Sequence, residues 1–97
     1  MTSKLDTFFG AMADPTRRAV IETLARGPAS VSTLHAPHAM ALPTFMRHLK
    51  VLEETGIVRS VKKGRVRTCH IDPAPLVEVQ GWLAWQREIW EHRSDRG

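Results

Sequence analysis

The first part of the chain repeats its hydrophobic residues at helical spacing. A stripe at i, i+3, i+4 and i+7 predicts a first helix through Leu5, Phe8, Phe9 and Met12. Asp14-Pro15 is typical of a helix start, because Asp is a favourable N-cap and Pro fits the first helical position. A second helix is therefore predicted over residues 15–26, with Gly27 suited to an αL C-cap before a proline.

Two further helices follow at shorter intervals. Ser30 can cap a short third helix that Pro37 limits, and residues 37–41 are then predicted to form a turn. A fourth helix is predicted from Leu42-Pro43 to an αL cap at Gly56. Its inward positions at i, i+4 and i+7 are Phe45, Leu49 and Leu52.

The hydrophobic period then changes from helix to strand. Residues 57–62 and 66–71 are rich in β-branched side chains and flank Lys63-Gly64, which predicts a two-stranded hairpin with Gly64 in its turn. Asp72-Pro73 starts a last helix that is predicted to continue to about Arg93. The predicted fold is mainly α with a β-hairpin wing, an α+β arrangement in the order four helices, hairpin, helix.

This order is that of a winged helix-turn-helix domain spanning residues 1–97. In such a domain the third helix braces the fourth, the fourth enters the major groove of DNA, and the hairpin adds further contacts. A chain of 97 residues is long enough for one small domain. One domain of this size buries a modest core, which makes a partner chain worth expecting.

The charge distribution agrees with a DNA-binding domain. The chain carries a net charge of +4, yet residues 47–67 hold seven basic and two acidic residues, a local charge of +5. The positive excess therefore falls on the predicted fourth helix and hairpin, where it would meet phosphates. A winged helix used only for protein association is the alternative, and an acidic or apolar surface there would favour it.

Other classes of protein are disfavoured. The chain has no apolar run long enough to cross a membrane and begins without a secretory signal, so we expect a cytoplasmic protein without a membrane partner. A glycine-rich phosphate loop, a Gly-x-Ser-x-Gly motif and a histidine metal motif are all absent from the sequence, so no enzymatic activity is expected. No cofactor is expected either.

Several segments resemble the ArsR-type (ArsR/SmtB-like) transcriptional repressors. Residues 11–21, from Ala11-Met12-Ala13-Asp14-Pro15 onward, are similar to the opening of that family, and residues 72–76 to the start of its last helix. Leu42-Pro43, residues 47–52 and residues 56–58 resemble its recognition helix and the exit from it. The resemblance covers residues 4–93 and implies a homodimer that binds an inverted repeat in promoter DNA and represses transcription.

The DNA-contacting residues are predicted on the fourth helix and the wing. They are Leu42, Pro43, Thr44, Met46, Arg47, Lys50, Lys62, Lys63, Arg65 and Arg67. Two positions differ from the family pattern, since Ala41 replaces a capping Ser and Met46 replaces another Ser. The helix therefore has few polar base readers, although apolar side chains can contact a thymine methyl group.

The dimer interface is predicted on the first and last helices, at about residues 4–13 and 73–93. These helices carry more large apolar side chains than one small core can cover, and exposed apolar patches mark association surfaces. The predicted interface residues are Leu5, Phe8, Phe9, Met12, Val79, Trp82, Leu83, Trp85, Ile89 and Trp90.

A metal- or thiol-responsive sensor is the remaining alternative. The third helix has no cysteine, the last helix offers only His92, and Pro37 separates His35 from His38, so a subgroup without metal sensing is expected. Cys69 and His70 are adjacent on a strand and would point to opposite faces. Cys69, a half-buried strand residue in the simplest interpretation, could act as a thiol trigger if Arg67 and His70 lowered its pKa. The sequence specifies neither an inducer nor an operator.

Overall fold

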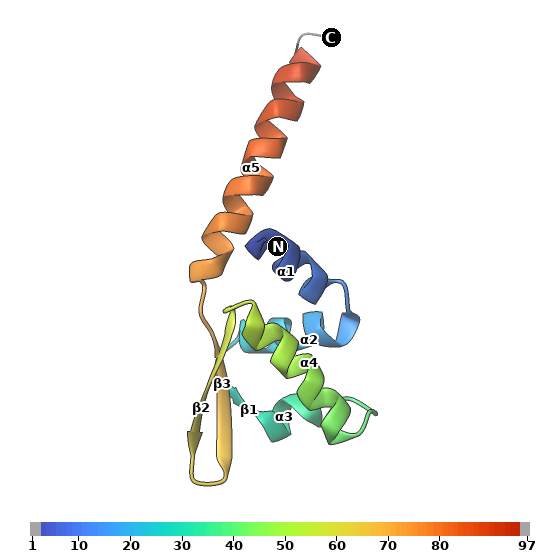
Figure 1. Cartoon of the computed structure of the whole chain (residues 1–97), viewed down its shortest axis with the longest axis vertical. Coiled ribbons are helices and arrows are strands. Elements are labelled where there is room, and N and C mark those ends of the chain that lie inside the picture. The colour runs from blue at the N-terminus through green and yellow to red at the C-terminus, as the bar shows by residue number, and fades with distance from the viewer. Residues whose placement is uncertain (1–2, 96–97) are drawn as a thin grey trace.

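The computed structural model describes residues 3–95 and has the predicted order of elements with one strand added. Figure 1 shows a helical body, a hairpin at one end and a long last helix that leaves the body at the other. The elements are α1 (Lys4–Met12), α2 (Pro15–Leu24), β1 (Ala29–Ser30), α3 (Val31–His35), α4 (Leu42–Glu54), β2 (Val58–Lys63), β3 (Val66–Ile71) and α5 (Ala74–Asp95).

Local side-chain caps start most of the helices. The Asp14 carboxylate accepts from the backbone N–H of Arg17, and the Ser30 hydroxyl accepts from that of Thr33, as the sequence predicts. Ser3 and Asp6 form a reciprocal capping box at the start of α1. Ala41 gives α4 no side-chain cap. The helices therefore begin where short-range hydrogen bonding dictates.

The end of α2 differs from the prediction, whereas the end of α4 agrees with it. Helix α2 ends at Leu24 with Ala25 as its cap, two residues before the predicted end. Gly27 has a φ of 145°, which is positive but far from the αL region, so it shapes the following loop instead of capping the helix. Gly56 follows the cap of α4 with a φ of 80°, which agrees with the predicted αL conformation.

The wing is part of a three-stranded antiparallel sheet in the order β1-β3-β2. The short strand β1 was not predicted, because two residues that pair with a segment far along the chain carry no local signal; Ala29 pairs with Cys69. The hairpin turn is shifted by one residue from the prediction. Lys63 pairs with Val66, so the turn residues are Gly64, at φ 59°, and Arg65.

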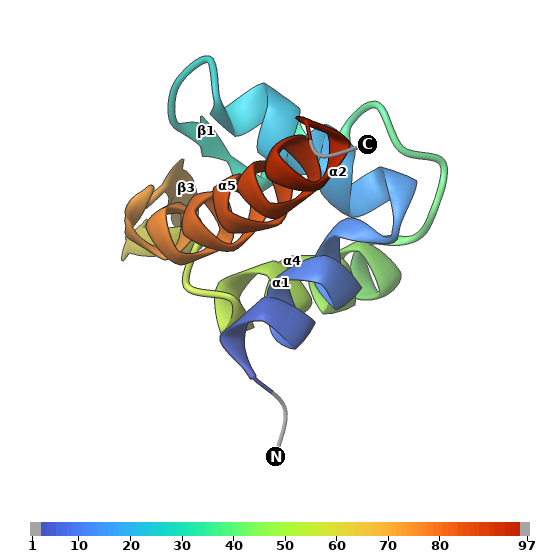
Figure 2. The ribbon, with the colours of Figure 1, turned by 90° about the horizontal axis from the view of Figure 1, so that it is seen from above.

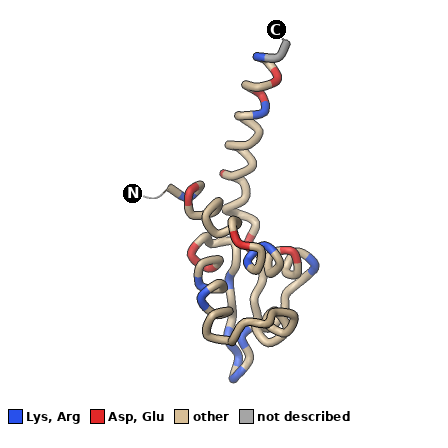
Figure 3. Tube along the Cα trace, turned by 90° about the vertical axis from the view of Figure 1, so that its right-hand side faces the viewer, with Lys and Arg blue, Asp and Glu red and all other residues tan. Residues whose placement is uncertain are grey.

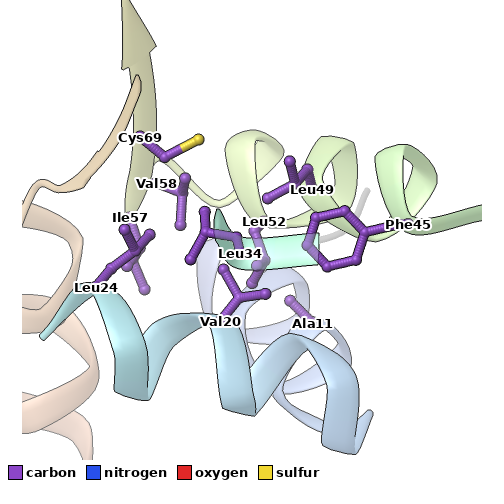
Figure 4. Packing of buried hydrophobic residues seen from close by; sticks show 10 residues of the cluster. All are labelled: Ala11, Val20, Leu24, Leu34, Phe45, Leu49, Leu52, Ile57, Val58 and Cys69. Carbon is purple, nitrogen blue, oxygen red and sulfur yellow. The ribbon is translucent and has the colours of Figure 1, made fainter. Parts of the chain in front are cut away.

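One hydrophobic core joins the helices to the sheet. Figure 4 shows side chains from α2, α3 and α4 converging beneath the strands. The three predicted inward residues of α4 are all buried. Ile57, predicted within a strand, is instead buried in the connection between α4 and β2. The core residues are Ala11, Val20, Leu24, Leu34, Phe45, Leu49, Leu52, Ile57, Val58 and Cys69.

A single guanidinium group links α1, α2 and α4. Arg17 Nε donates to the carbonyl oxygen of Ala11 at 2.7 Å, and Nη2 donates to that of Gly10 at 3.2 Å. Its Nη1 donates to Nδ1 of His48 at 3.1 Å. Two carbonyl groups in the last turn of α1 thereby accept hydrogen bonds from α2, and the same side chain reaches α4.

Asp72 attaches the wing to the last helix. Its Oδ1 accepts from the backbone N–H of Ala74 at 3.0 Å, and its Oδ2 accepts from Arg59 Nε on β2 at 2.7 Å. These bonds, first that from Ala74 and then that from Arg59, lower the pKa of the Asp72 carboxyl. The start of α5 is therefore fixed to the hairpin.

Helix α5 gives the protomer an elongated shape. Its C-terminal half leaves the body in Figure 1, and Figure 2 views the molecule from the side toward which α5 points. The molecule measures 58 × 30 × 25 Å, and its radius of gyration of 16.3 Å exceeds the roughly 12.5 Å of a compact chain of this length. No helix within residues 3–95 is both long and apolar enough to span a bilayer.

Candidate nucleic-acid interface

Helix α4 presents one buried face and one free face. The buried face rests on the core, whereas five of the predicted DNA-contacting residues are exposed, namely Leu42, Pro43, Thr44, Arg47 and Lys50. Met46 is half-buried against the core. Because the first turns of a recognition helix reach base edges, this free face is suited to the major groove.

Two histidines hold the turn between α3 and α4. His35 Nε2 donates to the carbonyl oxygen of Met40 at 2.8 Å. The rings of His35 and His38 contact Phe45, with centroid distances of 5.1 and 5.5 Å. These contacts brace α4 from the side of α3, so His35 and His38 have a structural role in this turn.

The tip of the hairpin is strongly basic. Lys62 lies opposite Arg67 in the strand register, Lys63 lies beside the turn, and Arg65 is in it. Figure 3 shows the resulting cluster of basic residues at the end of the molecule away from the C-terminus. All four are exposed except Arg67, which is half-buried.

The predicted DNA-contacting cations of α4 and the wing are uncompensated, whereas Arg59 of β2 is paired with Asp72. Within residues 3–93, none of the six predicted cationic contacts has a carboxylate within 4.0 Å. The nearest acidic residue in sequence, Glu53, instead accepts a hydrogen bond from the Ser60 hydroxyl on β2. A surface with this excess of free positive charge is suited to phosphate groups.

A cleft of about 430 Å³ separates α4 from the wing. Apolar side chains of α4 and β3 line it together with basic side chains of the hairpin and hydroxyl groups at the start of α3. The lining residues are Ser30, Val31, Ser32, Leu42, Met46, Lys62, Arg65, Val66 and Arg67. Five residues from the predicted DNA-contacting set therefore surround one cleft.

His48 faces into the protomer. Besides its bond to Arg17, Nδ1 lies 3.7 Å from Oδ2 of Asp14. The backbone N–H of Arg17 and, more weakly, the His48 ring lower the pKa of Asp14. The role of Arg17 was not predicted from the sequence, because its contacts exist only once α1, α2 and α4 are assembled.

The large apolar residues of α5 form an exposed face continuous with α1. Trp82 contacts the Phe9 ring, yet 43% of Trp82 and 67% of Trp90 remain exposed. Leu83, Trp85 and Ile89 are exposed as well. Phe8 and Met12 are half-buried and pack on the core. Leu5 is also half-buried and lines a cleft of about 510 Å³ between α1, α4 and α5.

Val79 was predicted in the dimer interface but does not belong to this exposed face. The side chain is only 6% exposed, because the start of α5 packs on the protomer at this point, next to Leu5 and Phe8 of α1. Val79 therefore contributes to the protomer's own packing. Helical spacing predicts the side of α5 on which Val79 lies, but it does not predict how closely α1 packs against that side.

Cys69 is fully buried between the other two strands, not half-buried as predicted. Burial raises the pKa of its thiol, Glu53 raises it further, and Arg67 opposes these effects only in part. The hypothesis that Arg67 and His70 lower the pKa of the Cys69 thiol is therefore wrong. Among the described residues, no group of three or more His, Cys, Asp or Glu side chains could hold a metal ion.

Comparison with protein families identifies a matching helix-turn-helix domain over residues 12–61. The chain is 36% identical over 86 residues to the HTH-type transcriptional regulator Rv2034 of Mycobacterium tuberculosis, covering 87% of this chain and 80% of the relative. It is 22% identical over 79 residues to the transcriptional repressor SdpR of Bacillus subtilis, covering 81% and 88% respectively.

Solved structures show the same architecture over nearly the whole chain. The crystal structure of an ArsR family transcriptional regulator has 54% sequence identity and a TM-score of 0.88, and the match covers 92% of this chain and 98% of the other. An ArsR-like transcriptional regulator from Rhodococcus sp. RHA1 has 29% identity and a TM-score of 0.77, with 93% and 85% covered.

Proposed function

Because the chain belongs to the ArsR family of helix-turn-helix transcriptional regulators, we propose that it represses transcription as a homodimer bound to an inverted repeat in promoter DNA. The family assignment confirms the predictions of a winged helix-turn-helix fold and of a DNA-binding regulator that is not an enzyme. Such a role would be carried out in the cytoplasm, next to the DNA.

The basic surface made by the six predicted cations of α4 and the wing, which have no carboxylate partner within residues 3–93, carries the DNA-binding proposal. Arg47 and Lys50 lie on the free face of α4, and the wing contributes basic residues at its tip. A major groove about 12 Å wide admits a helix of this kind. We assign base contacts to α4 and phosphate contacts chiefly to the wing.

The apolar face of α1 and α5 supports the homodimer. The three tryptophans, Leu83 and Ile89 of the predicted face remain exposed in the protomer, and covering such a face with a second copy removes apolar area from water. A two-fold axis is the commonest arrangement in homo-oligomers and makes the same patch serve both copies. It would place two recognition helices roughly 34 Å apart, one helical turn of DNA.

A repressor role is proposed from SdpR, a relative named as a transcriptional repressor. A dimer bound across a promoter would compete with the transcription machinery for the same DNA. We expect deletion of the gene to raise transcription from promoters that carry the bound sequence. A fall in transcription from those promoters would contradict the repressor assignment.

In vitro selection from randomised duplex DNA tests the binding proposal. The expected product is an inverted repeat with half-sites one helical turn apart, bound by two protomers. The triple variant that combines Arg47→Ala, Lys63→Ala and Arg65→Ala should lose this binding. Arg26→Ala, which removes an exposed cation in the turn after α2, is the control and should retain it. Failure of the wild-type protein to select any sequence would overturn the proposal.

A further inference from the structure

An apolar pair occupies the start of the recognition helix. Leu42 is the first residue of α4 and is 48% exposed, and Met46 lies one turn later on the same side. Both side chains open into the cleft between α4 and the wing, where Val66 of β3 is also exposed. The first turns of a recognition helix are those that reach base edges, so an apolar surface lies where polar readers are usually required.

Positive charge surrounds this apolar pair. Lys62, Arg65 and Arg67 line the same cleft, and none of them has a carboxylate partner within residues 3–93. Charge of this sign would draw the phosphate backbone of DNA towards the cleft. The apolar pair would then be held against the edges of the bases and not against bulk water.

On this basis we propose that Leu42 and Met46 read thymine by contact with its C5-methyl group. This inference rests on the proposed binding of duplex DNA and adds the base that the apolar pair selects. The major-groove edges of the four base pairs present hydrogen-bonding groups and a single apolar group, the thymine methyl. An apolar side chain gains little against the other edges because it cannot satisfy their donors and acceptors.

Replacing thymine by deoxyuridine in the selected DNA tests the inference, since it removes the methyl group and keeps the Watson–Crick pairing. We expect one or two thymines in each half-site at which the substitution weakens binding by about three- to fivefold, the size expected for one buried methyl. At those positions cytosine should bind more weakly than thymine, and 5-methylcytosine should recover part of the loss. The same thymines replaced outside the half-sites serve as the control.

Protein variants connect the methyl group to the apolar pair. In Leu42→Ala and Met46→Ala the deoxyuridine penalty should shrink towards zero at one of the sensitive positions each. Leu42 is half-exposed, so its truncation should leave the fold intact, which circular dichroism would verify. Arg47→Ala should bind more weakly overall but keep the full penalty, because it lies outside the cleft lining.

The outcomes separate this inference from the function on which it rests. Wild-type protein that selects an inverted repeat but tolerates deoxyuridine at every position would overturn the methyl contact and leave DNA binding in place. A penalty that persists unchanged in both Leu42→Ala and Met46→Ala would also overturn it. Absence of any selected sequence would overturn both proposals together.

Discussion

The indole ring of Trp82 on α5 meets the ring of Phe9 on α1 edge-on, with centroids 5.7 Å apart and planes inclined by 66°. This pair connects the two helices of the proposed dimer face within one protomer. Edge-to-face aromatic pairs contribute about 0.5–1.5 kcal/mol beyond the area they bury. Trp82 therefore stabilises the fold of the protomer in addition to forming part of the proposed dimer face. Trp90, at 67% exposure, has no aromatic partner of this kind within residues 3–93.

Trp90→Ala and Trp82→Ala are accordingly expected to differ. Trp90→Ala should weaken the dimer by about 2 kcal/mol, roughly thirtyfold in dissociation constant, with little loss of protomer stability. Trp82→Ala should weaken the dimer and also lower the unfolding free energy. Sedimentation equilibrium and urea titration would measure the two effects.

Val77→Ala is the control, since Val77 is as exposed as Trp90 but is not a predicted interface residue and lies about 20 Å along the axis of α5 from Trp90. It should leave the dimer unchanged. A Trp90→Ala protein that dimerises as tightly as the wild type would place the interface elsewhere.

The affinity for duplex DNA should fall steeply with salt. If about eight phosphates are neutralised per dimer, the slope of log K against log salt should be roughly −7. Fluorescence anisotropy with a labelled selected duplex between 50 and 300 mM salt would measure it. A slope near zero would show that the basic surface does not meet the phosphate backbone.

Base reading and phosphate binding should be separable by mutation. Arg47→Ala should relax the selected sequence at one position and cost about 1–3 kcal/mol if Arg47 contacts guanine. Lys63→Ala or Arg65→Ala should weaken all sequences about equally and reduce the salt slope by about one. An unchanged selected motif with Arg47→Ala would contradict the assignment of Arg47 as a base reader.

Cys69 should make the fold sensitive to alkaline pH. Its pKa is raised in the folded protein by burial, so its contribution to stability is fully present below the unfolded pKa of about 8.5. That contribution is lost as the pH rises through the folded pKa. Urea titrations at pH 7.5, 9 and 10 should show the loss, and the chain contains no tyrosine to titrate in that range.

Cys69→Val provides the comparison for this effect, because valine fills a similar volume and carries no proton. Its stability should depend less on pH above 8.5 than that of the wild type. Equal pH dependence in the two proteins would assign the effect to another group.

Zinc is not expected to regulate DNA binding. Cys69 is buried, His35 is bound to the Met40 carbonyl group, and His48 is bound to Arg17, so these donors do not converge. Added Zn²⁺ should change the affinity for the selected duplex by less than tenfold, a coupling of about 1.4 kcal/mol. Stoichiometric zinc that survives dialysis and exceeds this effect would contradict the expectation.

The elements that depend on short-range chemistry were predictable from the sequence. Asp14 and Ser30 accept hydrogen bonds from N–H groups three residues away, so each cap is encoded within four residues. Gly56 and Gly64 sit at positive φ, where glycine has no steric penalty. Helix α4 was predictable from its local hydrophobic spacing, and the basic cluster within residues 47–67 was predictable from the sequence of charges.

Features that depend on assembly were not predictable. Strand β1 exists because Ala29 meets Cys69, forty positions later, and neither residue signals the other. The burial of Val79 depends on how closely α1 approaches α5, and a helical period gives direction without distance. Arg17 reads as an ordinary surface cation until three helices surround it.

The place of Arg17 has a consequence for the geometry of the operator. Arg17 holds the end of α1, which we assign to the dimer, and contacts His48 on α4, which we assign to the bases. An operator of this kind consists of two half-sites of defined base sequence, separated by a spacer of defined length. In the proposed dimer, side chains on α4 would contact the bases of each half-site, and the angle between α1 and α4 would set the distance between the two α4 helices. One guanidinium group would thus help to fix the spacing between half-sites. We expect Arg17→Ala to broaden the range of spacer lengths that the dimer accepts while the base sequence of each half-site stays the same.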